Sequence, residues 1–162
     1  MAETDKMAVT LLKRLSTLEA QRQTWEDLWQ DIADYVVPRK ADITVKRSPG
    51  DKRTDRLFDA TAVHAAELLS ASLHGMLTNA STPWFSLRYR DPGFDADDTA
   101  KEWLEGATEV MYQALARSNF QEQIHELYHD LITFGTGIML VEADEKQKIR
   151  FSTRHISECY LS

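Results

Sequence analysis

The segment FDATAVHAAELLSASLHGMLTNASTPWFSLRYR, residues 58–90, is the one around which we expect the rest of the chain to be organised. In its first part, alanine and leucine recur at steps of three and four, which is the helical period. These residues are Ala62, Ala65, Leu69, Leu73 and Met76 or Leu77, and Ala66 and Leu68 widen the stripe. After a turn around Pro83, large apolar and polar residues alternate over 84–90, as they do in a half-buried strand. We therefore predict a helix with one dry face, capped by Asp59 or Thr61, then a short turn and a strand.

Length and composition place the chain among ordinary globular proteins. A chain of 162 residues with 43% hydrophobic and 28% charged residues predicts one domain. There is no apolar window long enough to cross a bilayer and no signal-peptide pattern at the start, so we expect an intracellular or virion-borne protein without a membrane partner. Cys159 is the one cysteine, which excludes an internal disulfide and a cysteine zinc site.

Charge is unevenly distributed along the chain. The formal net charge is −7, yet residues 38–56 hold seven basic and three acidic side chains, so this loop is +4 and the remainder −11. The basic residues are Arg39, Lys40, Lys46, Arg47, Lys52, Arg53 and Arg56. We expect a mobile basic loop over 38–57, with a short strand at 43–45 as an option. An acidic body with one basic loop suits a protein that lets a polyanion slide past, with these basic residues as possible contacts to DNA or a partner. We favour the other interpretation, a solvated loop without a partner.

A longer helix is predicted over residues 5–37, ahead of this loop. Apolar residues recur there at steps of three and four, with Arg22 as the one polar breach and Pro38 as the stop. The stripe includes Leu11, Leu15, Leu18, Trp25, Trp29 and Ile32. Such a seam fits packing on the domain's own core, on a neighbouring subunit or in a two-stranded coil.

Two more helices follow residue 90. The helical period predicts them over 97–117 and 119–134, with capping-box patterns that start at Thr99 and Ser118. Gly135 stands where a left-handed helix stop is wanted. The two helices meet almost directly, so we expect them to be consecutive in space as well as in sequence.

The last part of the chain predicts a small sheet. A hairpin is expected over 137–153, and its first strand, 137–141, is a continuous apolar run typical of a strand covered on both faces. Residues 159–161 resemble the start of a further strand. The predicted fold is α+β and predominantly helical, with a long N-terminal helix, three further helices and a small antiparallel sheet.

The segment HELYH, residues 125–129, matches the zinc-peptidase pattern H-E-x-x-H. A helix would place His125 and His129 one turn apart for a metal, with Glu126 to activate its water. Two observations argue against zinc: a charged residue, Asp130, follows the second histidine, and the metzincin extension is missing. The helical wheel also predicts that both histidines lie on the solvent-exposed face of the helix, away from its apolar stripe. We therefore favour two surface histidines, with a zinc metallopeptidase as the alternative.

Other patterns of catalysis are missing from the sequence. It contains no nucleophile elbow. Gly135-Thr136-Gly137 follows a predicted helix, whereas a phosphate loop follows a strand and leads into the N-terminus of a helix. The backbone donors and the helix dipole therefore point the wrong way to bind a phosphate group. The pair Trp84 and Phe85 is interpreted as an anchor for the core rather than as a base-stacking platform. We predict no enzyme, no catalytic residue, no cofactor and no metal.

Several segments in order resemble one family. The Pro-Trp-Phe start of 83–85, LITFGTGIML at 131–140 and RHISECYLS at 154–162 are similar to the N-terminal part of the portal proteins, or head-to-tail connectors, of short-tailed bacteriophages. The resemblance implies a structural subunit of a twelve-subunit ring at one vertex of the phage head. In that family the ring nucleates the procapsid, docks the terminase motor, passes double-stranded DNA and holds the tail.

The resemblance also implies which part of such a ring the chain would form. Residues 1–162 would be a single domain, the outer wing region, and the stem, clip and crown would lie beyond its end. We therefore expect a truncated gene, such as a decayed prophage copy, or a fragment. Its partners would be other copies of itself, capsid, motor and tail proteins and DNA, in the virion and, during assembly, in the host cytoplasm.

We further hypothesise that these residues alone do not form a stable dodecamer. A light-scattering mass near twelve times 18.6 kDa would refute this hypothesis. A helical adaptor or scaffold that dimerises through the seam from Leu11 to Val36 is a further alternative.

Overall fold

The computed structural model describes residues 2–90, 93, 97–145 and 148–161, with side chains from residue 6 onward. Its described helices and strands are α1 (Ala2–Val36), α2 (Thr61–Leu77), α3 (Asp98–Arg117), α4 (Phe120–Phe134), β1 (Ile138–Asp144) and β2 (Lys148–Arg154). Single 3-10 turns, η1 (Pro38–Lys40) and η3 (Ile156–Glu158), follow α1 and β2. The fold is thus α+β and predominantly helical, as the sequence predicts. Within the described residues, each helix is too short or too polar to cross a lipid bilayer.

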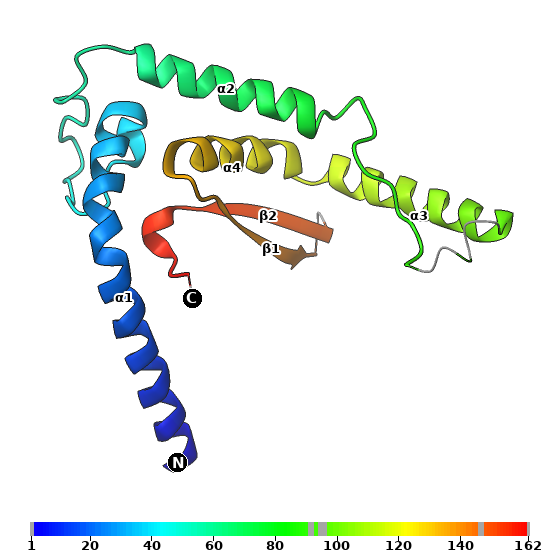
Figure 1. The fold of residues 1–162 in the computed structure, drawn as a ribbon, viewed down its shortest axis with the longest axis horizontal. Coiled ribbons are helices and arrows are strands. Elements are labelled where there is room, and N and C mark those ends of the chain that lie inside the picture. The colour runs from blue at the N-terminus through cyan, green and yellow to red at the C-terminus, as the bar shows by residue number, and fades with distance from the viewer. Residues whose placement is uncertain (1, 91–92, 94–96, 146–147, 162) are drawn as a thin grey trace.

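Helix α4 lies at the centre of the molecule. It has α2 on one side and the antiparallel β1–β2 hairpin on the other, while α1 crosses its C-terminal end and α3 leads away from its N-terminal end (Figure 1). Ser70 of α2 is fully buried, and its hydroxyl donates a hydrogen bond to the carbonyl oxygen of His125 in α4 at 3.2 Å. A small residue at this point lets the two helix backbones approach closely.

Two apolar clusters hold these layers together. The cluster at the α1 end joins Ala33, Ala41, Phe134 and Ile156, with Trp29 and Ile32 packed against it. The cluster at the hairpin end joins Phe120 and Ile124 of α4 to Phe151 of β2, with Met139 and Ile149 packed against it. Both clusters use α4, so this helix, rather than α2, organises the fold.

The predicted dry face of α2 is wrong. The buried residues of α2 are Ala66 and Ser70, whereas the predicted stripe is largely exposed, with Leu69 at 48% and Met76 at 72% of their accessible surface. The helix packs on α4 through its small residues because they allow close contact. Its larger apolar side chains are left facing outward.

The predicted strand over 84–90 is also wrong. These residues have no regular secondary structure, and the structure pairs them with no strand in the part of the chain that it describes. The hydroxyl of Tyr112 in α3 accepts hydrogen bonds from the amides of Trp84 and Phe85, both at 2.6 Å, and donates to the carbonyl oxygen of Phe85 at 2.8 Å. Thr108 accepts from the amide of Leu87 in the same way. Side chains of α3 therefore take the place of a neighbouring strand.

The helix ends differ from the predicted capping boxes. Asp97, not Thr99, caps α3, because its carboxylate accepts from the amides of Thr99 and Ala100. Asn119 precedes α4, and Ser118 accepts from the amide of Phe120. The left-handed stop at Gly135 is confirmed, with φ of 72°. Asp59 accepts from the amide of Thr61 as predicted, although Ala60 is the residue before α2.

The predicted hairpin is confirmed, but two other predicted strands do not form among the described residues. Strands β1 and β2 form the predicted hairpin, but β1 is not covered on both faces, since Val141 is 57% exposed. Residues 43–45 form bends instead of a strand, and residues 159–161 form no strand in the described chain.

Candidate functional site

The basic loop is folded onto carboxylates of the chain itself. Asp34 of α1 is buried, with 3% of its surface exposed, and binds Arg47 at 3.0 Å and Arg56 at 3.0 Å. Hydrogen bonding to Asp34 raises the pKa of both arginines above its usual value, so both stay charged. Further pairs are Arg39–Glu67, Lys52–Asp55, Arg53–Asp42 and Arg56–Asp31. Most of the loop's basic side chains thus bind carboxylates, either of the helices or of the loop itself.

Gln30 of α1 fixes the turn of the same loop. Its side-chain oxygen accepts hydrogen bonds from the amides of Ile43, Thr44 and Val45 at 3.0–3.3 Å, and its nitrogen donates to the carbonyl oxygen of Ala41 at 2.7 Å. The buried side-chain amide of Gln30 thus forms hydrogen bonds with four backbone groups of the loop. This explains why residues 43–45 are not a strand.

Lys40 of η1 reaches between the helices to α4. Its ammonium group lies 2.6 Å from Asp130 and 2.9 Å from Glu126. Asp130 is 2% exposed, so its charge is compensated inside the protein rather than by water. The hydrogen bond from Lys40 lowers the pKa of Glu126 below its usual value.

The wet-face prediction for the HELYH histidines is wrong for His129. This residue is 4% exposed, because α2 covers that side of α4. Its Nε2 lies 3.5 Å from Glu67 of α2, and neither ring nitrogen has a hydrogen-bond partner among the described residues. Burial lowers the pKa of His129 below its usual value.

The three HELYH side chains go to different partners. The ring of His125 lies 5.5 Å from that of His74, Glu126 binds Lys40, and His129 faces Glu67. Among the described residues, no group of three histidine, cysteine, aspartate or glutamate side chains is arranged to hold a metal ion. The geometry therefore gives the zinc-peptidase alternative no ligand set.

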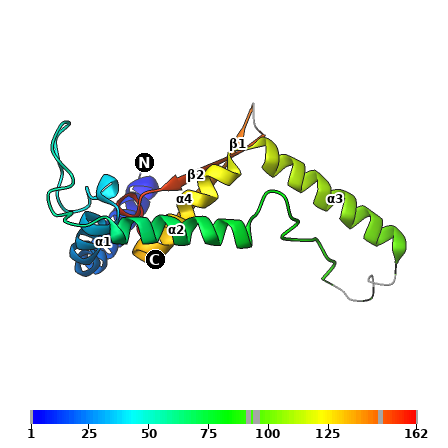
Figure 2. The same cartoon turned by 90° about the horizontal axis from the view of Figure 1, so that it is seen from above.

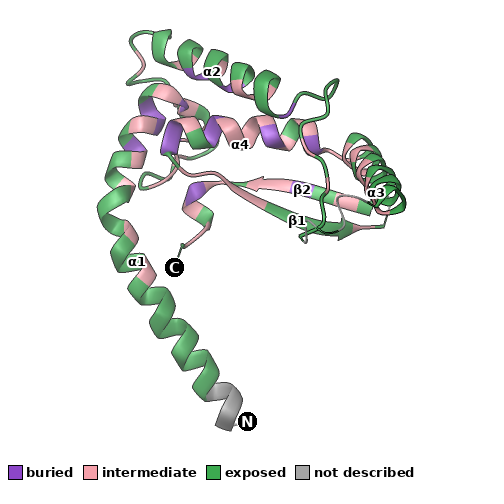
Figure 3. Ribbon diagram, turned by 45° about the vertical axis from the view of Figure 1, so that its right-hand side comes forward, coloured by how far each residue is buried: buried purple, intermediate pink, exposed green. Residues whose placement is uncertain are grey.

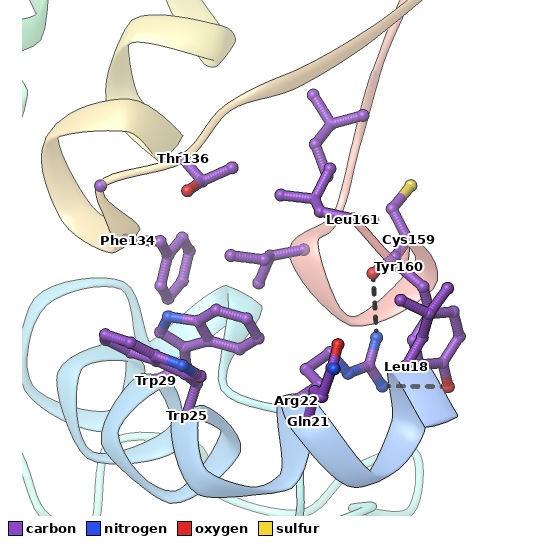
Figure 4. A pocket seen from close by; sticks show the side chains of 13 residues that line it. Leu18, Gln21, Arg22, Trp25, Trp29, Phe134, Thr136, Cys159, Tyr160 and Leu161 are labelled. Atoms are coloured by element: carbon purple, nitrogen blue, oxygen red, sulfur yellow. Dashed lines mark hydrogen bonds between the residues drawn. The ribbon is translucent and has the colours of Figure 1, made fainter. Parts of the chain in front are cut away.

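Arg22, the polar breach in the α1 seam, binds the end of the described chain. Its guanidinium donates to the carbonyl oxygens of Ser157 and Cys159 at 3.0 and 3.1 Å and lies 3.9 Å from the centre of the Tyr160 ring. Beside it, a groove of about 450 Å³ is lined by Trp25, Trp29 and Phe134 (Figure 4). A lone arginine inside an apolar stripe is the sequence signal that predicts such a contact.

The predicted packing residues divide into two groups. Trp29 and Ile32 pack on the core, and Trp84 stacks on Phe120 with ring centres 5.9 Å apart. Leu11 and Leu15, in contrast, are 57% and 38% exposed. Figure 3 shows that exposed residues predominate along the N-terminal half of α1 and on α3. The remaining predicted positions are partly buried, except for the exposed residues Trp25 and Leu69.

Comparison with known proteins shows which family this chain resembles. Residues 8–162 match the family model described as "Bacteriophage head to tail connecting protein". The chain is 33% identical over 163 aligned positions, all of its length, to the "Portal protein" of Salmonella phage epsilon15. It is also 33% identical over 135 residues, 83% of its length, to the "Probable portal protein" of Bordetella phage BPP-1.

The chain spans 29% and 24% of the lengths of these two relatives. The matches confirm the resemblance that the sequence segments indicate. Because the family model covers nearly all of the chain, the protein belongs to the family of bacteriophage head to tail connecting proteins.

Proposed function

We propose that this chain is the wing region of a portal ring, a structural subunit at one vertex of a phage head. The observation that carries the proposal is the combination of the family match with apolar helix faces left bare by the chain's own fold. Exposed apolar area of this extent marks an interaction surface. Its partners would be neighbouring copies and, in the assembled particle, capsid, motor and tail proteins.

Labelling of phage particles tests the proposal. Antibodies raised against the chain, applied to particles from the strain that encodes it, should label a single vertex of each head in electron micrographs. Antibodies against the major capsid protein serve as the control, since they should label the whole shell. Uniform labelling of the shell, or particles without label, would refute the proposal.

Within this function, we propose that DNA passes the chain without being gripped. The body is acidic, and most basic side chains of the loop are already paired with carboxylates. Few cations are therefore free to replace the counterions of phosphate groups. Binding to a mixed-sequence duplex should be weak and should change little between 50 and 200 mM salt. A steep salt dependence that is lost in Lys46→Ala/Lys52→Ala would instead assign the loop a contact with DNA.

An adaptor that pairs through α1 is the second candidate. The bare stripe at Leu11 and Leu15 favours it, because a helical adaptor needs only one such face. The vertex label discriminates between the two functions, since an adaptor outside the virion would give no labelled particles.

A further inference from the structure

Three of the chain's five histidines lie at one helix interface, where α2 crosses α4. His74 belongs to α2, and His125 and His129 belong to α4. His129 is 4% exposed, and both of its ring nitrogens lack a hydrogen-bond partner among the described residues. The rings of His74 and His125 lie 5.5 Å apart between their centres. Imidazoles change charge between pH 5 and 8, so acid adds positive charge inside this contact.

The surroundings of His129 favour its neutral form. Charged groups reach it from three elements: Glu67 of α2, Arg39 and Lys40 of η1, and Glu126 and Asp130 of α4. Glu67 lies 3.5 Å from Nε2 and favours a protonated ring, but it also binds Arg39 at 3.6 Å. Lys40 compensates the charges of Glu126 and Asp130. Burial is the largest effect, and it lowers the pKa of His129 below its usual value.

Gln121 and Tyr128 flank the other two histidine rings. Nε2 of His74 lies 2.6 Å from the side-chain oxygen of Gln121, and the ring of Tyr128 lies 6.5 Å from that of His74. Protonation of both His74 and His125 places like charges on two helices that face each other, and like charges at this separation repel. In acid this pair therefore acts in the same direction as His129, against contact between α2 and α4.

Helix α2 is attached to the body through small and polar residues. Its buried residues are Ala66 and Ser70, whereas its larger apolar side chains, such as Met76, face outward. Both views show α2 lying across α4 at the edge of the molecule (Figures 1 and 2). Residues 41–60 and 78–90, on either side of α2, contain no helix or strand. An element with little buried apolar area opens at a lower free-energy cost than the core does.

We propose that the contact between α2 and α4 is a pH-sensitive switch, closed at neutral pH and opened by acid while α4 stays packed on the hairpin. Opening uncovers the side of α4 that α2 hides, so the surface that the chain presents to a partner depends on pH. The proposal does not rest on the proposed function, because both helices belong to one molecule.

Proton uptake sets the size of the effect. Once α2 has moved away, the ring of His129 meets water and binds a proton as an ordinary histidine does, near pH 6.5. The open form then carries more protons than the closed form in acid, so a falling pH shifts the equilibrium toward it. For one histidine, the shift between pH 7.5 and pH 5.5 is at most about tenfold.

Hydrogen exchange of the native chain tests the switch. The protection of each amide is its exchange rate relative to that of an unstructured peptide at the same pH. A helix as short as α2 is marginal once it is detached, so opening exposes its amides. The protection of α2 should fall about tenfold between pH 7.5 and pH 5.5. At pH 5.5 the α2 amides should also be at least about tenfold less protected than those of α4.

Two results on the native chain overturn the proposal. Constant protection of α2 over this range would mean that the contact does not respond to pH. Equal protection of α2 and α4 at pH 5.5 would mean that α2 separates only when the whole chain unfolds. Neither result depends on a variant, so the proposal stays testable if a histidine substitution prevents folding.

Histidine variants assign the effect to its residues. His129→Gln should remove most of the fall in α2 protection, because a glutamine side chain does not titrate. His129→Gln combined with His74→Gln and His125→Gln should remove the rest. The matched control is His64→Gln, at an exposed position of α2, which should keep the fall. A fall that persists in the triple variant, or that His64→Gln removes, would assign the pH dependence to other groups and overturn the proposal.

Discussion

Helix α4 and the N-terminal half of α1 are both apolar-striped helices, and the structure uses them in opposite ways. Helix α4 is covered on two sides and contributes Phe120, Ile124 and Phe134 to the core. Along α1 the corresponding residues, such as Leu11, face outward. A stripe at helical spacing therefore indicates that a face will be covered, but not by what.

The difference between the two helices lies in their polar residues. Helix α4 carries buried polar groups with dedicated partners in other elements, such as Asp130 with Lys40. The C-terminal half of α1 does the same through Gln30 and Asp34. The described N-terminal half of α1 has no buried polar residue, and its side-chain hydrogen bonds, from Thr10 and Thr17, stay within the helix. Buried polar contacts specify where a stripe belongs, whereas a stripe without them is free to pack on a neighbour.

The largest expected effect comes from breaking the buried pair on α4. Asp130→Ala should lower the free energy of unfolding by about 3 kcal/mol, because it leaves the ammonium of Lys40 short of its closest partner. Urea unfolding measures the change. The control is Asp55→Ala, which removes the exposed pair with Lys52 and should cost less than about 0.5 kcal/mol. Equal losses in the two variants would mean that burial of the pair does not matter.

The next effect concerns the loop that α1 holds. Gln30→Ala should lower the free energy of unfolding by about 2 kcal/mol, because four backbone groups of the loop lose their partner. Hydrogen exchange should show faster exchange at the amides of residues 43–45. Gln23→Ala, at an exposed position of the same helix, should change neither quantity. Unchanged exchange in Gln30→Ala would show that the loop is held by its ion pairs alone.

A smaller effect should appear as a dependence on pH. Burial lowers the pKa of His129, so the unfolded chain takes up a proton near pH 6.5 while the folded chain stays neutral. Stability should therefore fall as the pH drops through about 6.5, with a slope of at most about 1.4 kcal/mol per pH unit, until the folded pKa is reached. His129→Gln should lose this part of the slope. The exposed residue His64 is the matched control, and a slope that His64→Gln removes instead would contradict the assignment.

The sequence predicts the fold class, the helices and the hairpin because periodicity and breakers are local properties. It misses three long-range effects. The wheel places His129 on a wet face because one sequence cannot show that α2 covers α4 there. The alternation over 84–90 is that of a strand, but Tyr112 supplies the hydrogen bonds from a helix. The stripe of α2 predicts a buried face that includes Leu69 and Ala66, whereas only Ala66 of these two is buried, beside Ser70 from the side predicted to be polar.

The smallest expected effect is the one that separates the two kinds of stripe. Leu11→Ala should change the free energy of unfolding by less than about 0.5 kcal/mol in dilute solution, because the side chain is 57% exposed and loses mainly contacts with water. Ile124→Ala, in the core, should cost about 3 kcal/mol under the same conditions.

The difference in stability loss between Leu11→Ala and Ile124→Ala should shrink as the protein concentration rises. Association that involves the α1 stripe stabilises the folded chain by mass action, so the melting temperature of the native chain should increase with concentration. Leu11→Ala should flatten that increase, whereas Ile124→Ala should lower the curve without changing its slope. If Leu11→Ala is as destabilising as Ile124→Ala at the lowest concentration, then the N-terminal half of α1 is part of the monomer's own core, and the distinction between a covered and an uncovered stripe does not hold.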